Sequence, residues 1–96
     1  MMDSDQERRA SIHTFYQVYR PLQKGRDIRS HMHFDVYGEN LIEVWDYVGG
    51  TKEHCICRVR EDDEVTCYKR AIEILMIYNK KGEREGYGQK VEQRAG

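Results

Sequence analysis

Two pairs of metal-binding residue types occur in the chain at a spacing of two. His31 and His33 form one pair, and Cys55 and Cys57 form the other. In a β-strand, residues i and i+2 point to the same face, so each pair could offer two ligands to a tetrahedral zinc ion. The strand alternation described below directs the histidines outward and the cysteines inward. Neither spacing is the gap of roughly two to four residues that structural zinc sites show. The sequence therefore predicts core cysteines, solvent-facing histidines and no metal site.

The three cysteines could also include a catalytic nucleophile. A cysteine nucleophile needs a partly exposed thiolate close to a histidine. Cys67 is the best placed of the three cysteines, with His54 or His13 as its conceivable partner. No local signature supports this arrangement, and a free cysteine more commonly packs as a small apolar side chain. The sequence favours a structural role for Cys67.

An acidic run, Glu61-Asp62-Asp63-Glu64, could serve as a divalent-cation site or as an acid–base pair. Acidic residues at the start of a helix already have a sufficient cause, because they cap the first turn and complement the helix dipole. We therefore predict no catalytic residue, no cofactor and no enzymatic activity.

Composition bounds the class of protein. The chain has 96 residues, of which 39% are hydrophobic and 34% charged, with a net charge of −1. A chain of this size forms one domain with a modest core, and its balanced charge gives no general reason to expect nucleic acid or an anionic membrane. Three cysteines without a secretory or membrane-spanning apolar run predict a reducing, cytoplasmic environment and no membrane partner.

The charge is not balanced everywhere, because the stretch from residue 20 to residue 33 is basic. It contains one acid, Asp27, and four basic residues that are candidates for phosphate contacts: Arg20, Lys24, Arg26 and Arg29. A basic loop is thus expected in a neutral protein.

One helix is predicted over residues 62–81. Asp62 or Asp63 is the expected N-cap, Lys80 and Lys81 complement the C-terminal dipole, and Gly82 follows as the expected C′ residue. The helix contains the most apolar run of the chain, so the core is expected to form around it.

Three strands precede this helix, at about residues 31–37, 41–48 and 54–60, where apolar and polar residues alternate. Gly38 and Gly49 mark the turns between them, and residues 22–30 are expected to be a loop. The segment 11–20 fits both periods, and its Thr, Phe, Tyr and Val content favours a strand over a helix. The expected fold is a two-layer α+β domain, ββββα or αβββα, with the helix covering an antiparallel sheet.

The domain is expected to span residues 11–82. Residues 1–10 and 83–96 are polar or rich in glycine, and we expect them to form flexible tails.

The predicted helix has more apolar surface than three strands can cover. The stripe expected to face the sheet contains Val65, Tyr68, Ile72, Leu75 and Met76, and a second cluster extends the apolar arc to roughly 200°. Either the segment 11–20 folds back over this cluster or a homodimer forms through it. The candidates for self-association are Cys67, Ala71, Ile74 and Tyr78.

The alternation directs Met32, Phe34, Val36, Ile42, Val44, Cys55, Cys57 and Val59 toward the helix. The opposite face then carries aromatic residues and arginines, a composition typical of recognition surfaces. Its outward set also contains Asp35, Leu41, Glu43 and Ile56, and the candidate partner-binding residues are His31, His33, Tyr37, Trp45, Tyr47, Arg58 and Arg60. We expect Trp45→Ala to weaken partner binding and to leave most of the stability intact.

Two functions from different classes follow from this face. The favoured one is a non-enzymatic protein-binding module, a class that includes adaptors, regulatory subunits and small inhibitors such as those that phages make against host defence enzymes; no residue singles out one of these. The alternative is a module that binds RNA or single-stranded nucleic acid through the same face and the basic stretch. The order αβββα resembles a double-stranded-RNA-binding module, but the acidic run stands where such modules carry lysines.

Overall fold

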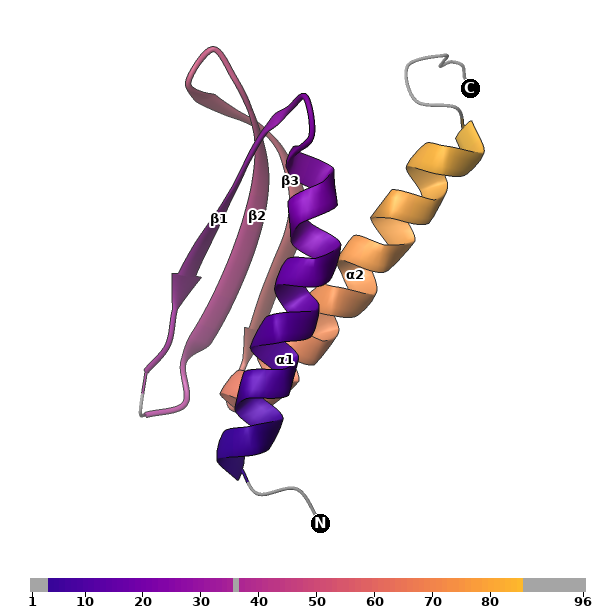
Figure 1. Ribbon diagram of the computed structural model, residues 1–96. Helices are drawn as coiled ribbons and strands as arrows, with labels where there is room; N and C mark the ends of the chain where they lie inside the picture. The colour runs from indigo at the N-terminus through magenta and orange to yellow at the C-terminus, as the bar shows by residue number, and fades with distance from the viewer. Residues whose placement is uncertain (1–3, 36, 86–96) are drawn as a thin grey trace.

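The computed structural model describes residues 4–35 and 37–85, which form two helices, a short 3-10 turn and a three-stranded antiparallel sheet. The elements are α1 (Ser4–Tyr19), η1 (Arg20–Gln23), β1 (Asp27–His33), β2 (Asn40–Val48), β3 (Thr51–Glu61) and α2 (Glu64–Glu85). The sheet order is β1-β2-β3, and both helices lie on one of its faces (Figure 1). The predicted two-layer α+β fold is confirmed, in its αβββα form.

The segment 11–20 is helical, so the expectation of a strand there was wrong. Ser11, Phe15 and Tyr19 are buried at a spacing of four, which places all three on the inner side of α1. The Phe15 ring stacks on Tyr19 at 5.5 Å and meets Tyr68 of α2 edge-on at 5.6 Å. These tertiary contacts outweigh the β propensity of Thr, Phe, Tyr and Val.

α1 also extends further toward the N-terminus than the sequence suggested. Residues 4–10, expected to belong to a flexible tail, form its first turns. Of the expected C-terminal tail, residues 83–85 are the end of α2, and residues 86–96 lie outside the described residues, as do residues 1–3.

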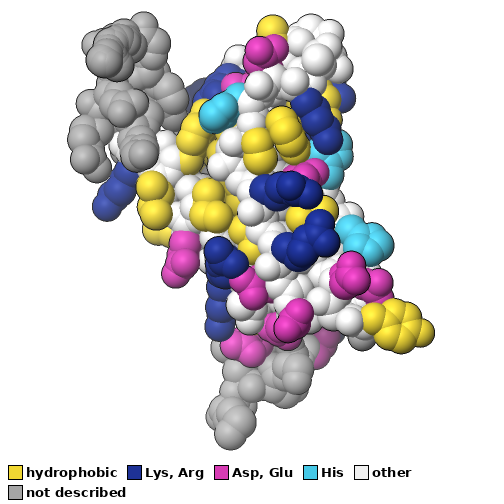
Figure 2. Space-filling view, turned by 180° about the vertical axis from the view of Figure 1, so that it is seen from behind, with side chains coloured by type: hydrophobic (Ala, Val, Ile, Leu, Met, Phe, Trp, Pro, Cys, Tyr) yellow, Lys and Arg dark blue, Asp and Glu magenta, His cyan; other side chains and the backbone are white. Residues whose placement is uncertain are grey.

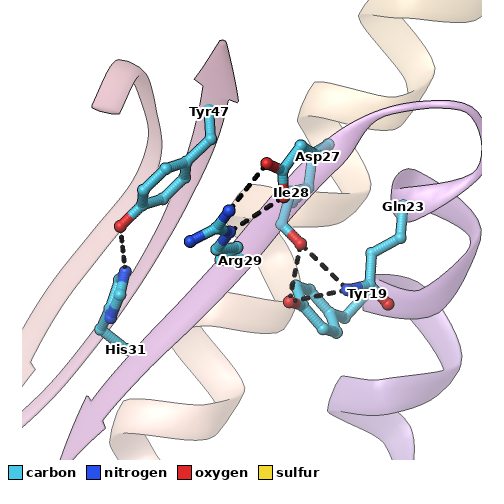
Figure 3. A network of polar contacts seen from close by, with 7 residues as sticks. All are labelled: Tyr19, Gln23, Asp27, Ile28, Arg29, His31 and Tyr47. Carbon is cyan, nitrogen blue, oxygen red and sulfur yellow. Dashed lines mark hydrogen bonds and ion pairs between the residues drawn. The ribbon is translucent and has the colours of Figure 1, made fainter. Parts of the chain in front are cut away.

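A side-chain anchor connects the end of α1 to the first strand (Figure 3). The Tyr19 hydroxyl donates to the Ile28 carbonyl oxygen at 3.1 Å, and Gln23 Nε2 donates to the same oxygen at 2.9 Å. Ile28 is 1% exposed. The chain that leaves η1 is thereby fixed against β1, which is an edge strand of the sheet.

β1 begins at Asp27, within the stretch that was expected to be a loop, and ends at His33 rather than at residue 37. Asp27 and Arg29 occupy outward positions of this edge strand. Because both are charged, the sequence of this segment was predicted to be a loop and not a strand. Tyr37 therefore lies in the turn before β2, with its backbone N–H donating to Asp35 Oδ1 at 2.8 Å. Val36, expected to be inward, lies outside the described residues.

Two register shifts interrupt the pairing of β2 with β3, after Val44 and after Asp46, and the first of them changes the expected alternation of β3. Val44 is opposite Cys57, but the next residue of β2, Trp45, is opposite Cys55, which leaves Ile56 as the extra residue of a β-bulge. Cys55 consequently shares the face of Trp45, not the helix-covered face as expected. Ile56, expected to be outward, is buried at 8% exposure.

α2 begins where the acidic run predicted. Asp63 Oδ2 accepts the backbone N–H of Thr66 at 2.9 Å, as an N-cap does, and also its hydroxyl at 2.9 Å. The helix then continues through Gly82, the residue expected to end it, as far as Glu85.

The two apolar arcs of α2 have the reverse of their expected roles. Cys67 Sγ lies 3.5 Å from the carbonyl oxygen of Val59, so the arc that contains Cys67 faces the sheet. Tyr68, from the arc expected to face the sheet, contacts Phe15 of α1, while Met76 from the same arc is 53% exposed. α1 thus covers part of the arc that was expected to face the sheet, whereas the second cluster, over which residues 11–20 were expected to fold, lies against the sheet.

Candidate functional site

The face of the sheet opposite the helices is the candidate site, and we call it the outer face. Residues directly opposite in adjacent antiparallel strands share a face. Because Ile28, Ile42, Val44 and Val59 belong to the buried core, the alternating positions point away from the helices. From β1 to β3, the outer face carries four rows: Asp27-Tyr47-Lys52, Arg29-Trp45-Cys55, His31-Glu43-Arg58 and His33-Leu41-Arg60.

Tyr47 is the centre of a polar network at one end of the outer face (Figure 3). Its hydroxyl lies 2.7 Å from His31 Nε2, and the Arg29 guanidinium sits 4.2 Å from the centre of its ring. Arg29 also makes two bonds of 2.9 Å to the Asp27 carboxylate. Hydrogen bonding from Arg29 lowers the pKa of Asp27. The network holds an aromatic ring and an arginine in a defined position.

Trp45 occupies the middle of the outer face. Its side chain is half-buried, and the Lys52 ammonium lies 4.9 Å from the centre of its ring. Its indole N–H is buried and finds no acceptor among the described residues. Trp45 therefore contributes both to the sheet and to the surface, in line with the predicted register of β2.

The opposite end of the outer face is basic. Glu43, whose side chain is only 15% exposed, pairs with Arg58 at 3.0 Å. His33 and Arg60 flank the half-buried Leu41, and neither forms a salt bridge with any other described residue. An arginine without a carboxylate partner remains available to an acidic group from outside the chain.

Charge is distributed unevenly between this face and the rest of the protein. The outer face carries four Lys and Arg side chains and two carboxylates, whereas the whole chain has a net charge of −1. In the view from behind, basic, acidic, histidine and hydrophobic side chains lie interspersed over this side of the molecule (Figure 2). The surface combines positive charge with aromatic and aliphatic area.

The structure brings together six of the seven predicted partner-binding residues. His31, His33, Trp45, Tyr47, Arg58 and Arg60 all lie on the outer face. Tyr37 is 89% exposed but projects from the β1–β2 turn. Asp27, Arg29 and Lys52 were missed as members of this face, because the first strand was predicted to begin at residue 31 and the third strand at residue 54, after these residues.

The four predicted phosphate contacts do not form one loop. Arg20 lies over the Tyr16 ring of α1, 5.4 Å from its centre, and Arg29 belongs to β1. Arg26 donates to Asp46 Oδ2 at 2.6 Å and to the Tyr78 hydroxyl at 2.7 Å. Burial lowers the pKa of Arg26, but the hydrogen bonds and charge interactions with Tyr78 and Asp46 together raise it above its usual value. Lys24 is exposed in the turn that follows η1.

The four residues proposed for self-association are mostly internal. Cys67 and Ala71 are fully buried within the monomer, and Ile74 and Tyr78 are half-buried against the core. The large apolar side chains that α2 exposes are instead Met76 and Ile77.

The cysteines and the acidic run have structural surroundings. Burial raises the pKa of the Cys57 thiol to about 12 and also raises the pKa of Cys67, so neither supplies the thiolate that a nucleophile needs at neutral pH. Glu64 pairs with Arg8 of α1 at 2.9 Å, and Glu61 pairs with Arg70. Among the described residues, no cluster of three or more His, Cys, Asp or Glu side chains could hold a metal ion.

Asn40 is a structural residue that the sequence did not single out. It is 4% exposed, and its Nδ2 donates to the carbonyl oxygens of Glu61 and Asp62 while its Oδ1 accepts the Asp35 N–H. The turn before β2 is thereby joined to the start of α2. An asparagine next to a glycine turn is its only signal in the sequence.

No helix in the described part of the chain is long and apolar enough to cross a membrane. Comparison with protein-family models, with curated proteins and with solved structures finds no match to this chain.

Proposed function

We propose that this protein is a non-enzymatic protein-binding module that acts in the cytoplasm and binds its partner through the outer face of its sheet. The observation that carries the proposal is the one-sided packing of the fold. Both helices lie on the same face of the sheet, so no described element covers the other face, which presents Trp45, Tyr47 and several arginines. Aromatic and arginine side chains are the residue types that dominate binding energy at protein interfaces.

The partner that fits this face carries carboxylates around an apolar anchor. Arg60 and His33 have no internal acidic partner among the described residues, and they flank Leu41. Arg29, by contrast, is paired with Asp27 and lies over the Tyr47 ring. We expect it to contribute a fixed contact surface and not an unpaired charge. Adaptors, regulatory subunits and small inhibitors all use such surfaces, and the proposal extends to each of these roles.

The test compares two charge reversals in a pull-down from the native host. Arg60→Glu places a carboxylate at the basic end of the outer face, and we expect it to remove the captured partner or to weaken its binding by at least about tenfold. Arg9→Glu is the matched control, because Arg9 is exposed on α1 and its one salt bridge with a described residue is a surface pair with Asp5. The control variant should retain the partner.

Nucleic acid is the competing partner, and the same experiment distinguishes it. Capture that nuclease treatment abolishes, together with a gel shift at low salt, would replace the protein-binding proposal by nucleic-acid binding. Equal loss or equal retention of the partner by the Arg60 and Arg9 variants would mean that the outer face is not the binding surface.

A further inference from the structure

A second surface lies in the helical layer, on the side of the molecule away from the outer face. Met76 and Ile77 of α2 are 53% and 58% exposed, although they are large apolar side chains. With Val18 of α1 they line an open groove whose remaining walls are Glu73, Asn79 and Lys80. The C-terminal half of α2 diverges from α1 (Figure 1), so α1 does not cover these side chains. Adjacent exposed apolar side chains that line a groove are candidates for a contact surface.

The charges beside this groove are arranged symmetrically along α2. Glu73 precedes Met76 by three residues, and Lys80 follows Ile77 by three residues. Glu73 and Lys80 are seven residues apart, which is about two helical turns, so both lie on the same side of the helix. Both are exposed, and neither forms a salt bridge with another described residue.

This arrangement is self-complementary in one orientation only. When two identical helices pack antiparallel around a twofold axis between Met76 and Ile77, residue 73 of one helix lies opposite residue 80 of the other. One Glu73–Lys80 pair then lies at each end of the apolar centre. A parallel pair would place Glu73 against Glu73 and Lys80 against Lys80, which is unfavourable. A partner segment of a single charge sign would likewise be repelled at one end.

We propose that the occupant of this groove is a second copy of the chain, with the two α2 helices packed antiparallel about a twofold axis at Met76 and Ile77. In this dimer, Glu73 of each protomer pairs with the partner subunit's Lys80, and Met76 and Ile77 form the apolar centre. The interface is isologous, so it closes at two copies and does not propagate into fibres. The outer faces remain free, and the dimer therefore does not depend on the proposed partner-binding function.

Sedimentation equilibrium over a range of concentrations tests this dimer through four charge variants. Glu73→Lys and Lys80→Glu each place like charges opposite one another at both ends of the interface. We expect each to raise the dimer dissociation constant by at least about tenfold. The double variant E73K/K80E exchanges the two charges and should restore the wild-type dissociation constant. Glu53→Lys on β3 is the matched control, because Glu53 is exposed outside the helical layer, and it should leave the dimer unchanged.

Mixing the two single variants gives the most specific result. A protomer with Glu73→Lys and a protomer with Lys80→Glu oppose unlike charges at both ends, so an equimolar mixture should form a heterodimer although neither variant dimerises well alone. Ile77→Asp should abolish the dimer while circular dichroism shows a folded monomer. A monomeric wild type at the highest attainable concentration would overturn the proposal. A dimer that Glu73→Lys does not weaken, or that the mixture does not restore, would also overturn it.

Discussion

Trp45 contributes both to the stability of the fold and to the outer face. It is half-buried on the outer face beneath the Lys52 ammonium, and its indole N–H is buried without an acceptor among the described residues. An unsatisfied buried donor costs about 1–3 kcal/mol, because it loses its water without gaining a partner. The ring, in contrast, contributes favourable apolar burial and a cation–π contact. The two halves of this side chain therefore act in opposite directions on stability.

Two substitutions of Trp45 separate these contributions. Trp45→Ala removes the ring and should lower the free energy of unfolding by about 1–3 kcal/mol, less than for a fully buried tryptophan. Trp45→Phe keeps an aromatic ring and removes the unpaired N–H, so its cost should be below about 1 kcal/mol. Urea denaturation measures both values. If Trp45→Phe were as destabilising as Trp45→Ala, the expected gain from removing the unpaired N–H would be wrong.

At the scale of single elements, the start of α2 shows how the acidic run acts. The Asp63 carboxylate accepts both the backbone N–H and the hydroxyl of Thr66, and the backbone N–H of Cys67 donates to the Asp63 carbonyl oxygen at 3.0 Å. The neighbouring Asp62 participates through its backbone, because its carbonyl oxygen accepts from Asn40. Two adjacent aspartates thus have different roles, and only one side chain caps the helix.

Asp63→Ala should lower the free energy of unfolding by about 1 kcal/mol, because it leaves the first-turn N–H of Thr66 without an acceptor. Asp62→Ala is the matched control, since it removes the same charge near the helix N-terminus and should cost only a few tenths of that amount. Thermal or urea unfolding of the two variants makes the comparison. Equal losses would show that charge near the helix dipole, and not the cap, stabilises the start of α2.

The elements also show which parts of the fold are readable from the sequence. α2, its N-cap and the inward positions Ile42 and Val44 were predicted correctly, because capping residues and strict alternation are local signals. The strand expected at residues 11–20 was wrong because the contacts of Phe15 with Tyr68 of α2 are distant in sequence. The faces of Cys55 and Ile56 differ from the prediction because the extra residue at Ile56 reverses the alternation of β3 between its two register shifts.

The candidate site, like the fold, was predicted correctly where the signal in the sequence is local. Arg58, Arg60 and Trp45 were placed on one face because they lie where the alternation of their strands holds. Arg29 could not be placed with them, because the charged outward residues of β1 made the start of this strand look like a loop in the sequence. The groove at Met76 and Ile77 was also missed, since the helical period alone does not show which arc of α2 the other elements will cover.

At the scale of the whole molecule, the core contains ionisable groups that remain protonated when folded. Cys57 is 2% exposed and Tyr68 is 4% exposed. Burial raises the pKa of Cys57 from 9.0 to about 12 and the pKa of Tyr68 from 10.0 to about 12. Since the unfolded chain releases these protons at lower pH than the folded chain, unfolding is coupled to deprotonation in alkaline solution.

The free energy of unfolding should therefore fall between about pH 9 and pH 12. A raised folded-state pKa contributes stability that is fully present below the unfolded pKa and is lost as pH rises toward the folded pKa, at up to about 1.4 kcal/mol per group for each pH unit. Urea denaturation at a series of pH values measures this slope. Cys57→Ala lacks the buried thiol, so its slope should be shallower than that of the wild type between pH 9 and pH 10, where the unfolded-state pKa of Tyr68 has not yet been passed. Parallel curves for the two proteins would mean that the Cys57 thiol titrates in the folded protein as it does in the unfolded chain, and hence that solvent reaches the space between α2 and the sheet.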